Sequence, residues 1–268
     1  MLKKVFIAST LVIIGLFTSL LFYPNISKLK YENPQKTSFM KYREKEWLKE
    51  GKKYKIQQKW IKLSKVSPYL IKAVLISEDD KFWKHEGFDY DAIKKAIEKD
   101  IKAKKFKVGG STISQQVTKN LYLSPSKNPI RKLIEFILTW RLERTLTKKR
   151  ILEIYLNIAE WGDKGIFGIE MAAQHYYGKH AYDLNPEESA RLAAVLPNPR
   201  IYNPLSNSKY VINRSNLIYS IMLKRGIIAP EYDNIITNEE QSEESNIEQL
   251  DNIPETPNDS ESIKEQPQ

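Results

Sequence analysis

One residue of this sequence that could act as a general base is Glu78, a carboxylate that directly follows an apolar run. Residues 74–76 are Val, Leu and Ile, and the apolar spacing from Pro68 predicts a helix that ends at Ser77-Glu78-Asp79. Such a helix would deliver the carboxylate to the mouth of a cleft, where partial shielding from water suits a general base. Taken alone, the segment favours the more common case, an exposed glutamate at a helix end.

A second segment combines a glycine turn with polar side chains on one helical face. Gly109-Gly110 precedes Ser111-Thr112, and Thr112 and Gln115 have the spacing of a capping box that begins a helix. Three polar residues then recur at i, i+3 and i+4 and share one face of that helix: Gln116, Lys119 and Asn120. They could bind a polar ligand or form an ordinary polar surface. No lysine follows the glycines at the spacing of a P-loop.

A third segment places a carboxylate beside two cations. Arg131, Lys132 and Glu135 lie at i, i+1 and i+4 of a predicted helix whose other positions are largely apolar. One interpretation is an ion-pair stripe on the surface, worth a few tenths of a kcal/mol at about 0.3–0.5 kcal/mol per pair. The other is a site for a diphosphate, because clustered Arg and Lys bind phosphate oxygens and stabilise charge on a departing group. Spacing alone does not decide between them.

The elements that must position these residues are mainly helices. From residue 66 to residue 237 the apolar residues recur at helical spacing, as in 71–75, 93–101, 133–140 and 151–158. Few runs alternate apolar and polar residues as half-buried strands do, and no internal repeat is evident. The sequence therefore predicts one mainly α-helical domain over residues 66–237.

The two ends of the chain predict different structures. Residues 5–23 form an uncharged, mostly apolar run of nineteen residues, long enough to cross the ~30 Å hydrocarbon layer as a helix. No small-x-small cleavage site follows, so residues 1–23 are predicted to be a cytoplasmic N-terminus with an uncleaved, single-pass anchor. Residues 24–65 are expected to be a juxtamembrane connector with one short helix around 42–50. Residues 238–268 are acidic, contain three prolines and are expected to be disordered.

Charge and composition narrow the classes of partner. The net charge is +10, but residues 238–268 carry ten Asp or Glu against one Lys, a charge of −9, which leaves +19 for residues 1–237. A body this basic expects nucleic acid, anionic lipid or a phosphorylated substrate. The chain has no cysteine, so disulfides, thiolate metal sites and a Cys nucleophile are excluded. Its three histidines lack the spacing of a zinc site, and no metal-ligand cluster is legible.

Taken together, these segments resemble the glycosyltransferase family 51 domain of peptidoglycan polymerases, most closely its stand-alone, monofunctional form. The match covers residues 66–204, about half of the chain. Its blocks occur in the order of the family: Glu78-Asp79 with Phe82, His85 and Gly87; 109–116 continuing into Lys119-Asn120-Leu121; Arg131-Lys132 with Glu135; 149–157; Gly168; 172–178; and 193–199.

The resemblance implies a lysozyme-like, mainly α-helical domain on the outer face of the bacterial plasma membrane. It implies polymerisation of lipid II into glycan strands, with Glu78 as the general base that takes the proton of the GlcNAc 4-hydroxyl. That oxygen would attack the anomeric carbon of the growing chain with inversion, and undecaprenyl diphosphate would leave. The chain lacks a penicillin-binding domain, so peptide cross-linking is not expected.

The resemblance also assigns the remaining site residues. Lys119, Arg131 and Lys132 match positions that hold the phosphates of the substrates, and Glu135 matches a second carboxylate that assists departure directly or by orienting those cations. Three residues would line the sugar cleft: Ser111, Gln116 and Asn120. No cofactor is required, although a divalent cation such as Mg²⁺ or Mn²⁺ could bridge the diphosphate. The expected partners are lipid II, the growing glycan strand, the plasma membrane and other cell wall synthesis proteins, but not nucleic acid.

Two other functions fit parts of the sequence. A lysozyme-like hydrolase or lytic transglycosylase could share the fold and the catalytic glutamate, yet it needs no diphosphate site, so the cations at 119, 131 and 132 argue against it. A non-catalytic membrane scaffold could use the basic body to bind anionic lipid or nucleic acid. It predicts that Glu78→Gln changes nothing, and neither alternative requires both carboxylate segments and the cations.

Overall fold

The computed structural model describes residues 22–94, 110–125 and 128–228, together with the single residues Lys3, Phe6, Thr10, Gly15 and Glu98. Helices dominate the described residues, which confirms the predicted mainly helical class. Their strands are β1 (Gln57–Gln58) and β2 (Ile166–Phe167), which pair in parallel with Gln57 opposite Ile166.

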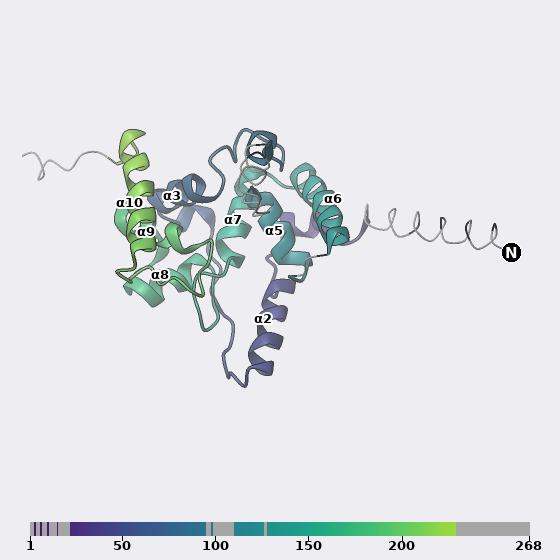
Figure 1. Ribbon diagram of the computed structural model, residues 1–268, viewed down its shortest axis with the longest axis horizontal. Helices are drawn as coiled ribbons and strands as arrows, with labels where there is room; N and C mark the ends of the chain where they lie inside the picture. The colour runs from purple at the N-terminus through teal and green to yellow at the C-terminus, as the bar shows by residue number, and fades with distance from the viewer. Residues whose placement is uncertain are drawn as a thin grey trace, which may run out of the picture. The chain divides into compact units, whose positions relative to one another are not determined.

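The helices pack in two groups that Figure 1 shows on either side of the domain centre. The first group is α3 (Pro68–Glu78), α9 (Pro186–Val195) and α10 (Lys209–Lys224), which contact one another. In the second, α5 (Ile113–Tyr122) packs on α2 (Ser38–Lys49), α6 (Pro129–Thr145) and α7 (Lys148–Ile158). Shorter elements complete the described chain: η1 (Ile26–Lys30), η2 (Leu63–Lys65), α8 (Ile169–Tyr177) and η3 (Ala181–Asp183).

Local sequence signals set where the helices begin. Pro68, Pro129 and Pro186 each stand in the first turn of a helix, where a missing N–H costs nothing. The capping box predicted at the start of α5 is present: Thr112 Oγ1 accepts from the Gln115 N–H, and Gln115 Oε1 accepts from the Thr112 N–H at 3.0 Å. The capping box thus sets the residue at which α5 begins.

The segment expected to be a connector contributes to the core. Met40 and Trp47 of α2 and Ile26 of η1 are fully buried in the same apolar cluster as α3, α5 and α7. The short helix expected around 42–50 begins at Ser38, because Thr37 caps it through the Met40 N–H. The expected connector thus also packs on the core, since a few large buried side chains suffice to anchor a charged segment.

Several predicted features lie outside the described residues. They include most of the anchor at 5–23, Gly109, the apolar positions 97 and 101, and the acidic tail at 238–268. In the part of the chain that the structure does describe, no helix has both the length and the apolar character needed to cross a membrane.

Candidate active site

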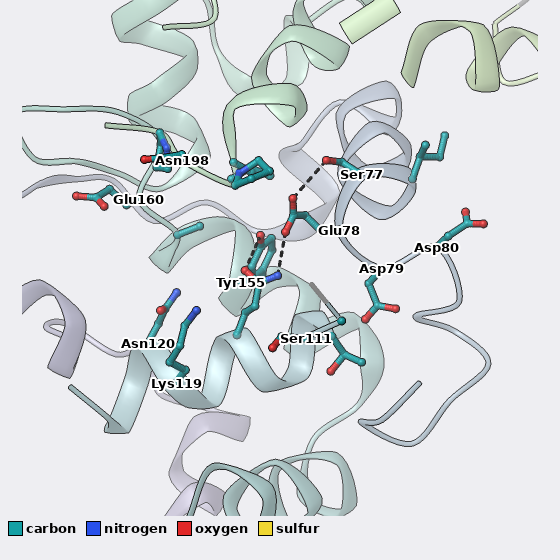
Figure 2. Close-up of a pocket in the computed structure, with 18 of the residues that line it drawn as sticks. Ser77, Glu78, Asp79, Asp80, Ser111, Lys119, Asn120, Tyr155, Glu160 and Asn198 are labelled. Atoms are coloured by element: carbon teal, nitrogen blue, oxygen red, sulfur yellow. Dashed lines mark hydrogen bonds between the residues drawn. The ribbon is translucent and has the colours of Figure 1, made fainter. Parts of the chain in front are cut away.

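A cleft of about 810 Å³ lies between the two helix groups. The C-terminal end of α3 and the chain that follows α9 form one wall, and the polar face of α5 forms the other. Figure 2 shows Glu78 near the centre of this cleft, with Lys119 and Asn120 on the facing helix. The cleft thus combines residues from segments that are far apart in the sequence.

The Glu78 carboxylate is held at both oxygens. Gln116 Nε2 donates to Glu78 Oε2 at 2.9 Å, and the Ser77 hydroxyl lies 3.3 Å from Oε1 (Figure 2). Glu78 is half-buried as the last residue of α3, so the predicted delivery of a carboxylate to a cleft by an apolar helix is correct. Its orientation is fixed by a partner on another helix, which a lone exposed glutamate would not have.

Tyr155 of α7 supports Glu78 indirectly, through Gln116. Its side chain is 1% exposed, and its hydroxyl donates to Gln116 Oε1 at 3.4 Å. Burial first, then the negative charges of Glu78 and Asp79, raise the pKa of Tyr155 well above its usual 10.0, so the hydroxyl stays a donor. The Gln116 amide is therefore turned with its NH₂ toward Glu78. In the sequence, Tyr155 is one of the apolar positions at 151–158 and lies in the family block 149–157, but neither pattern predicts its contact with Gln116.

Asp79 fastens the turn that follows Glu78 to the start of α5. The buried Asp79 carboxylate accepts from the Ile113 N–H at 2.9 Å and lies 2.9 Å from His85 Nε2. His85 Nδ1 accepts from the Gly87 N–H at 3.1 Å, which leaves the ring hydrogen on Nε2, facing Asp79. Gly87 has φ +93°, and a Cβ there would stand 2.9 Å from Glu143 Cγ, so the turn requires glycine. Asp79, His85 and Gly87 thus hold the turn after Glu78 in place against the start of α5.

The polar face predicted for α5 points into the cleft. Gln116, Lys119 and Asn120 all line it, as does Ser111 just before the helix. Burial lowers the pKa of Lys119 below its usual 10.5, and the neighbouring Glu135 partly offsets this effect. Within the described residues, the structure records no hydrogen bond or ion pair to Lys119 Nζ. A desolvated ammonium in a cleft is suited to bind an anionic ligand.

Glu135 forms the predicted cluster with the two cations, but it does not line the cleft. Its side chain is 2% exposed and accepts from Arg131 Nη1 at 3.2 Å and from Lys132 Nζ. A fully exposed ion-pair stripe is therefore excluded. None of these three residues is among the described residues that line the cleft, and their link to it is the electrostatic influence of all three on Lys119.

The cleft is also lined by a buried ion pair that the sequence did not predict. Arg43 of α2 donates to Glu160 Oε2 through Nε at 3.1 Å and Nη2 at 2.7 Å, and both residues line the cleft. Glu46 Oε2 accepts hydrogen bonds from Arg43 Nη1 at 2.7 Å and from Arg200 Nη1 at 3.0 Å. These two bonds connect α2 to the chain after α9. Burial raises the pKa of Glu160 above its usual 4.5, although Arg43 opposes this. No short-range pattern marks a pair 117 residues apart.

Replacing Arg43 with alanine is expected to destabilise the fold by about 3–5 kcal/mol, because Glu160 would keep a buried charge without a partner. Because the pKa of Glu160 is raised, the folded state binds the Glu160 proton more tightly than the unfolded state does. The contribution of Glu160 to the free energy of unfolding therefore falls as the pH rises above 4.5. Urea unfolding at acidic and neutral pH should show a larger loss at neutral pH. Arg43→Ala with Glu160→Gln should recover part of the loss; no recovery would contradict the pairing argument.

Comparison with known proteins decides the family. A family model described as transglycosylase matches residues 44–223, about two thirds of the chain. The chain belongs to the transglycosylase family. The matched region begins inside α2, so the transglycosylase domain includes part of the segment once expected to be a connector. The resemblance stated from the sequence is confirmed, and the chain is an enzyme of the glycosyltransferase type.

Curated relatives of this transglycosylase cover most of its length. The biosynthetic peptidoglycan transglycosylase of Nitrosospira multiformis is 45% identical over 197 residues, which is 74% of this chain and 85% of that protein. Its counterpart in Dechloromonas aromatica is 48% identical over 171 residues, 64% of this chain and 74% of the relative. That of Laribacter hongkongensis is 40% identical over 210 residues, 78% and 92% of the two chains.

Proposed function

We propose that this transglycosylase polymerises lipid II into β-1,4-linked glycan strands for the bacterial cell wall and releases undecaprenyl diphosphate. The observation that carries the proposal is the placement of the Glu78 carboxylate and the Lys119 ammonium in one cleft, with Glu78 oriented by Gln116 and Ser77. The names of the relatives, biosynthetic peptidoglycan transglycosylases, support the same reaction.

In the proposed reaction, Glu78 accepts the proton of the GlcNAc 4-hydroxyl of an incoming lipid II. The freed oxygen attacks the anomeric carbon at the reducing end of the growing strand, from the face opposite the α-linked diphosphate. A C–O bond to the 4-oxygen forms as the bond to the diphosphate oxygen breaks, with inversion to the β linkage. The bonding electrons leave with undecaprenyl diphosphate, and Glu78 then returns its proton to solvent.

The leaving group gains negative charge, and the proposed role of the cations is to stabilise it. Lys119 would contact the phosphates directly, which also offsets the cost of its burial. Glu135 would hold Arg131 and Lys132 in place behind Lys119 and so act by orienting them. Ser111, Gln116 and Asn120 line the cleft with hydroxyl and amide groups suited to sugar hydroxyls.

A divalent cation is not assigned to residues of this chain. Among the described residues, no group of three or more His, Cys, Asp or Glu is placed to hold one. Asp79, the carboxylate next to Glu78, is already engaged by His85 and the Ile113 N–H. Any Mg²⁺ or Mn²⁺ would therefore be held mainly by the diphosphate of the substrate, and no step here depends on it.

The proposed location is the outer face of the plasma membrane, with residues 5–23 as anchor and other cell wall synthesis proteins as partners. One feature of α6 supports it: four large apolar side chains share an arc of its surface and are 43–63% exposed, namely Ile130, Leu133, Phe136 and Trp140. Apolar groups gathered in this way favour burial in a lipid or protein interface. This face would hold the cleft close to a lipid-linked substrate.

A fluorescent label at Leu133 is expected to report contact with lipid. The chain contains no cysteine, so Leu133→Cys provides a unique attachment point for an environment-sensitive dye. In liposomes holding the full chain, its emission should shift to shorter wavelength, because the side chain leaves water. The same dye at Leu217→Cys of α10, which is 59% exposed, is the control. Equal spectra at the two sites would contradict membrane contact by α6.

Incubation of the full chain in detergent with labelled lipid II tests the proposed function. We expect a ladder of polymer that lysozyme digests to small fragments. Purified cell walls serve as a second substrate, since a hydrolase or lytic enzyme would release soluble glycan from them. Failure to form polymer with folded protein, across several detergents and divalent ions, would reject the polymerase.

A further inference from the structure

Arg214 of α10 reaches across to the end of α3, where Glu78 is located. Its Nη2 donates to the Ser77 hydroxyl at 3.0 Å and approaches the Ser77 carbonyl oxygen at 3.3 Å. Arg214 lines the same cleft as Glu78. A residue 137 positions away in the sequence therefore touches the immediate neighbour of the proposed base.

Arg214 is committed to this contact. Its Nε is buried and has no hydrogen-bond partner among the described residues. Across those same residues, the structure also records no ion pair between Arg214 and a carboxylate. A guanidinium normally satisfies its donors with carboxylate or carbonyl groups, so a partly desolvated one held by a single serine calls for a functional reason.

The end of α3 is a place where a cation has a strong effect. The last carbonyls of a helix lack intrahelical partners, and the helix dipole makes this end negative. Glu78, Asp79 and Asp80 add three carboxylates at the same end. Arg214 caps the Ser77 carbonyl and offsets this negative charge. Its positive charge thereby weakens the repulsion between the Glu78 carboxylate and those of Asp79 and Asp80.

The Ser77 hydroxyl connects Arg214 to Glu78. Its oxygen accepts from Arg214, and its single hydrogen can point to Glu78 Oε1 at 3.3 Å or to the Ala193 carbonyl at 3.1 Å. A charged Glu78 attracts the hydrogen, whereas a protonated Glu78 needs it less. Figure 2 shows the Ser77 hydroxyl directed at the Glu78 carboxylate.

We infer that Arg214 is a positioning residue for the glycosyl transfer, acting through the Ser77 hydroxyl to hold the Glu78 carboxylate at the angle from which it accepts a proton. Arg214 itself touches no reacting atom in this scheme. The inference rests on the proposed function, in which Glu78 is the base. It adds α10 to the elements that shape the active site.

Kinetics with labelled lipid II test the inference in the full chain. Arg214→Ala is expected to lower kcat about 10- to 100-fold, as for misplacement of a catalytic group, with KM changed less than about twofold. Arg214→Lys should recover much of the rate, because one donor remains. Ser77→Ala should also lower kcat, and Arg214→Ala should add little further loss in that background.

A matched control separates positioning from general bracing by α10. Arg225 also joins α10 to the chain after Glu78, through two hydrogen bonds to Asp80 at 2.5 and 2.9 Å, but it does not touch Ser77. Arg225→Ala should keep near-normal kcat. Equal losses at the two arginines, or independent losses for Arg214→Ala and Ser77→Ala, would overturn the inference. Thermal unfolding of each variant identifies a loss that merely follows unfolding.

A readout without substrate keeps this inference distinct from the proposed function. In a crystal structure of free Arg214→Ala, the Glu78 side chain should leave its contact with Gln116 or occupy a second rotamer. An unmoved Glu78 would overturn the role of Arg214 whatever the reaction is. Conversely, absence of polymer from the unmutated chain would reject the proposed function while the position of Glu78 still decides this inference.

Discussion

Replacing Glu78 with glutamine is expected to reduce glycan polymerisation by about 10²- to 10⁴-fold, the usual contribution of a general base. The amide keeps the size of the carboxylate but cannot accept the proton of the attacking hydroxyl. Gln116 would then face an amide in place of a carboxylate oxygen, so the local contact survives in weakened form. Initial rates with labelled lipid II, resolved on gels, measure the effect.

Glu86→Gln is the matched control for this prediction. It makes the same chemical change a few residues further on, at an exposed side chain that does not line the cleft. It should leave the rate within about twofold, as expected for a surface change with little effect on the fold. Thermal unfolding should be nearly unchanged for both variants. Substantial polymer from Glu78→Gln would remove Glu78 from the role of base, although the chain would still be a polymerase.

The parts of the site that the sequence predicted correctly depend on local rules. The capping box of Thr112 and Gln115 fixes the start of α5, and helical spacing alone then places Lys119 and Asn120 on the face that lines the cleft. The pairing of Glu135 with Arg131 is likewise a contact within one turn. In each case the physical cause lies within a few residues.

The parts that the sequence did not predict depend on contacts between distant segments. Arg43 meets Glu160 and Arg214 meets Ser77 only because segments more than a hundred positions apart in the sequence pack together. The burial of Glu135 is a further example, since spacing left open whether its ion pairs were exposed. Charged residues are usually at the surface, so their sequence pattern carries little information about burial.

The expected connector shows the same limit from the other direction. Residues 24–65 are rich in charge and show little apolar periodicity, which favours a solvated segment. Two large side chains of α2, Met40 and Trp47, nevertheless anchor it in the core, and Arg43 of the same helix reaches the cleft. Burial of a large apolar side chain contributes about 1.5–3 kcal/mol to stability. Two such side chains therefore hold this segment against the core even though its apolar periodicity is weak.

Replacing Glu135 with glutamine is expected to lower the polymerisation rate by about 10²- to 10³-fold, comparable to the loss of an electrostatic group from an active site. The buried carboxylate pairs with Arg131 and Lys132, and both cations would lose their orientation. Loss of these charge-assisted hydrogen bonds should also cost about 1.5–3 kcal/mol of unfolding free energy.

The pH dependence of Glu135→Gln follows from its effect on Lys119. Burial already lowers the pKa of Lys119, and the charge of Glu135 raises it again. Without that charge the pKa falls further, so Lys119 loses its proton at lower pH. If the reaction needs Lys119 charged, the alkaline limb of the rate profile should move toward neutral pH in the variant.

A second buried carboxylate of α6 is the control that gives this prediction its meaning. Glu143 accepts from Lys148 Nζ at 2.7 Å and from the Ser114 hydroxyl, and it is not among the residues that influence Lys119 most. Glu143→Gln should therefore lower stability to a similar extent while retaining most of the rate and an unchanged alkaline limb. Parallel losses of rate and of stability in both variants would mean that Glu135 only supports the fold, and Lys119 would then have to stabilise the leaving diphosphate without it.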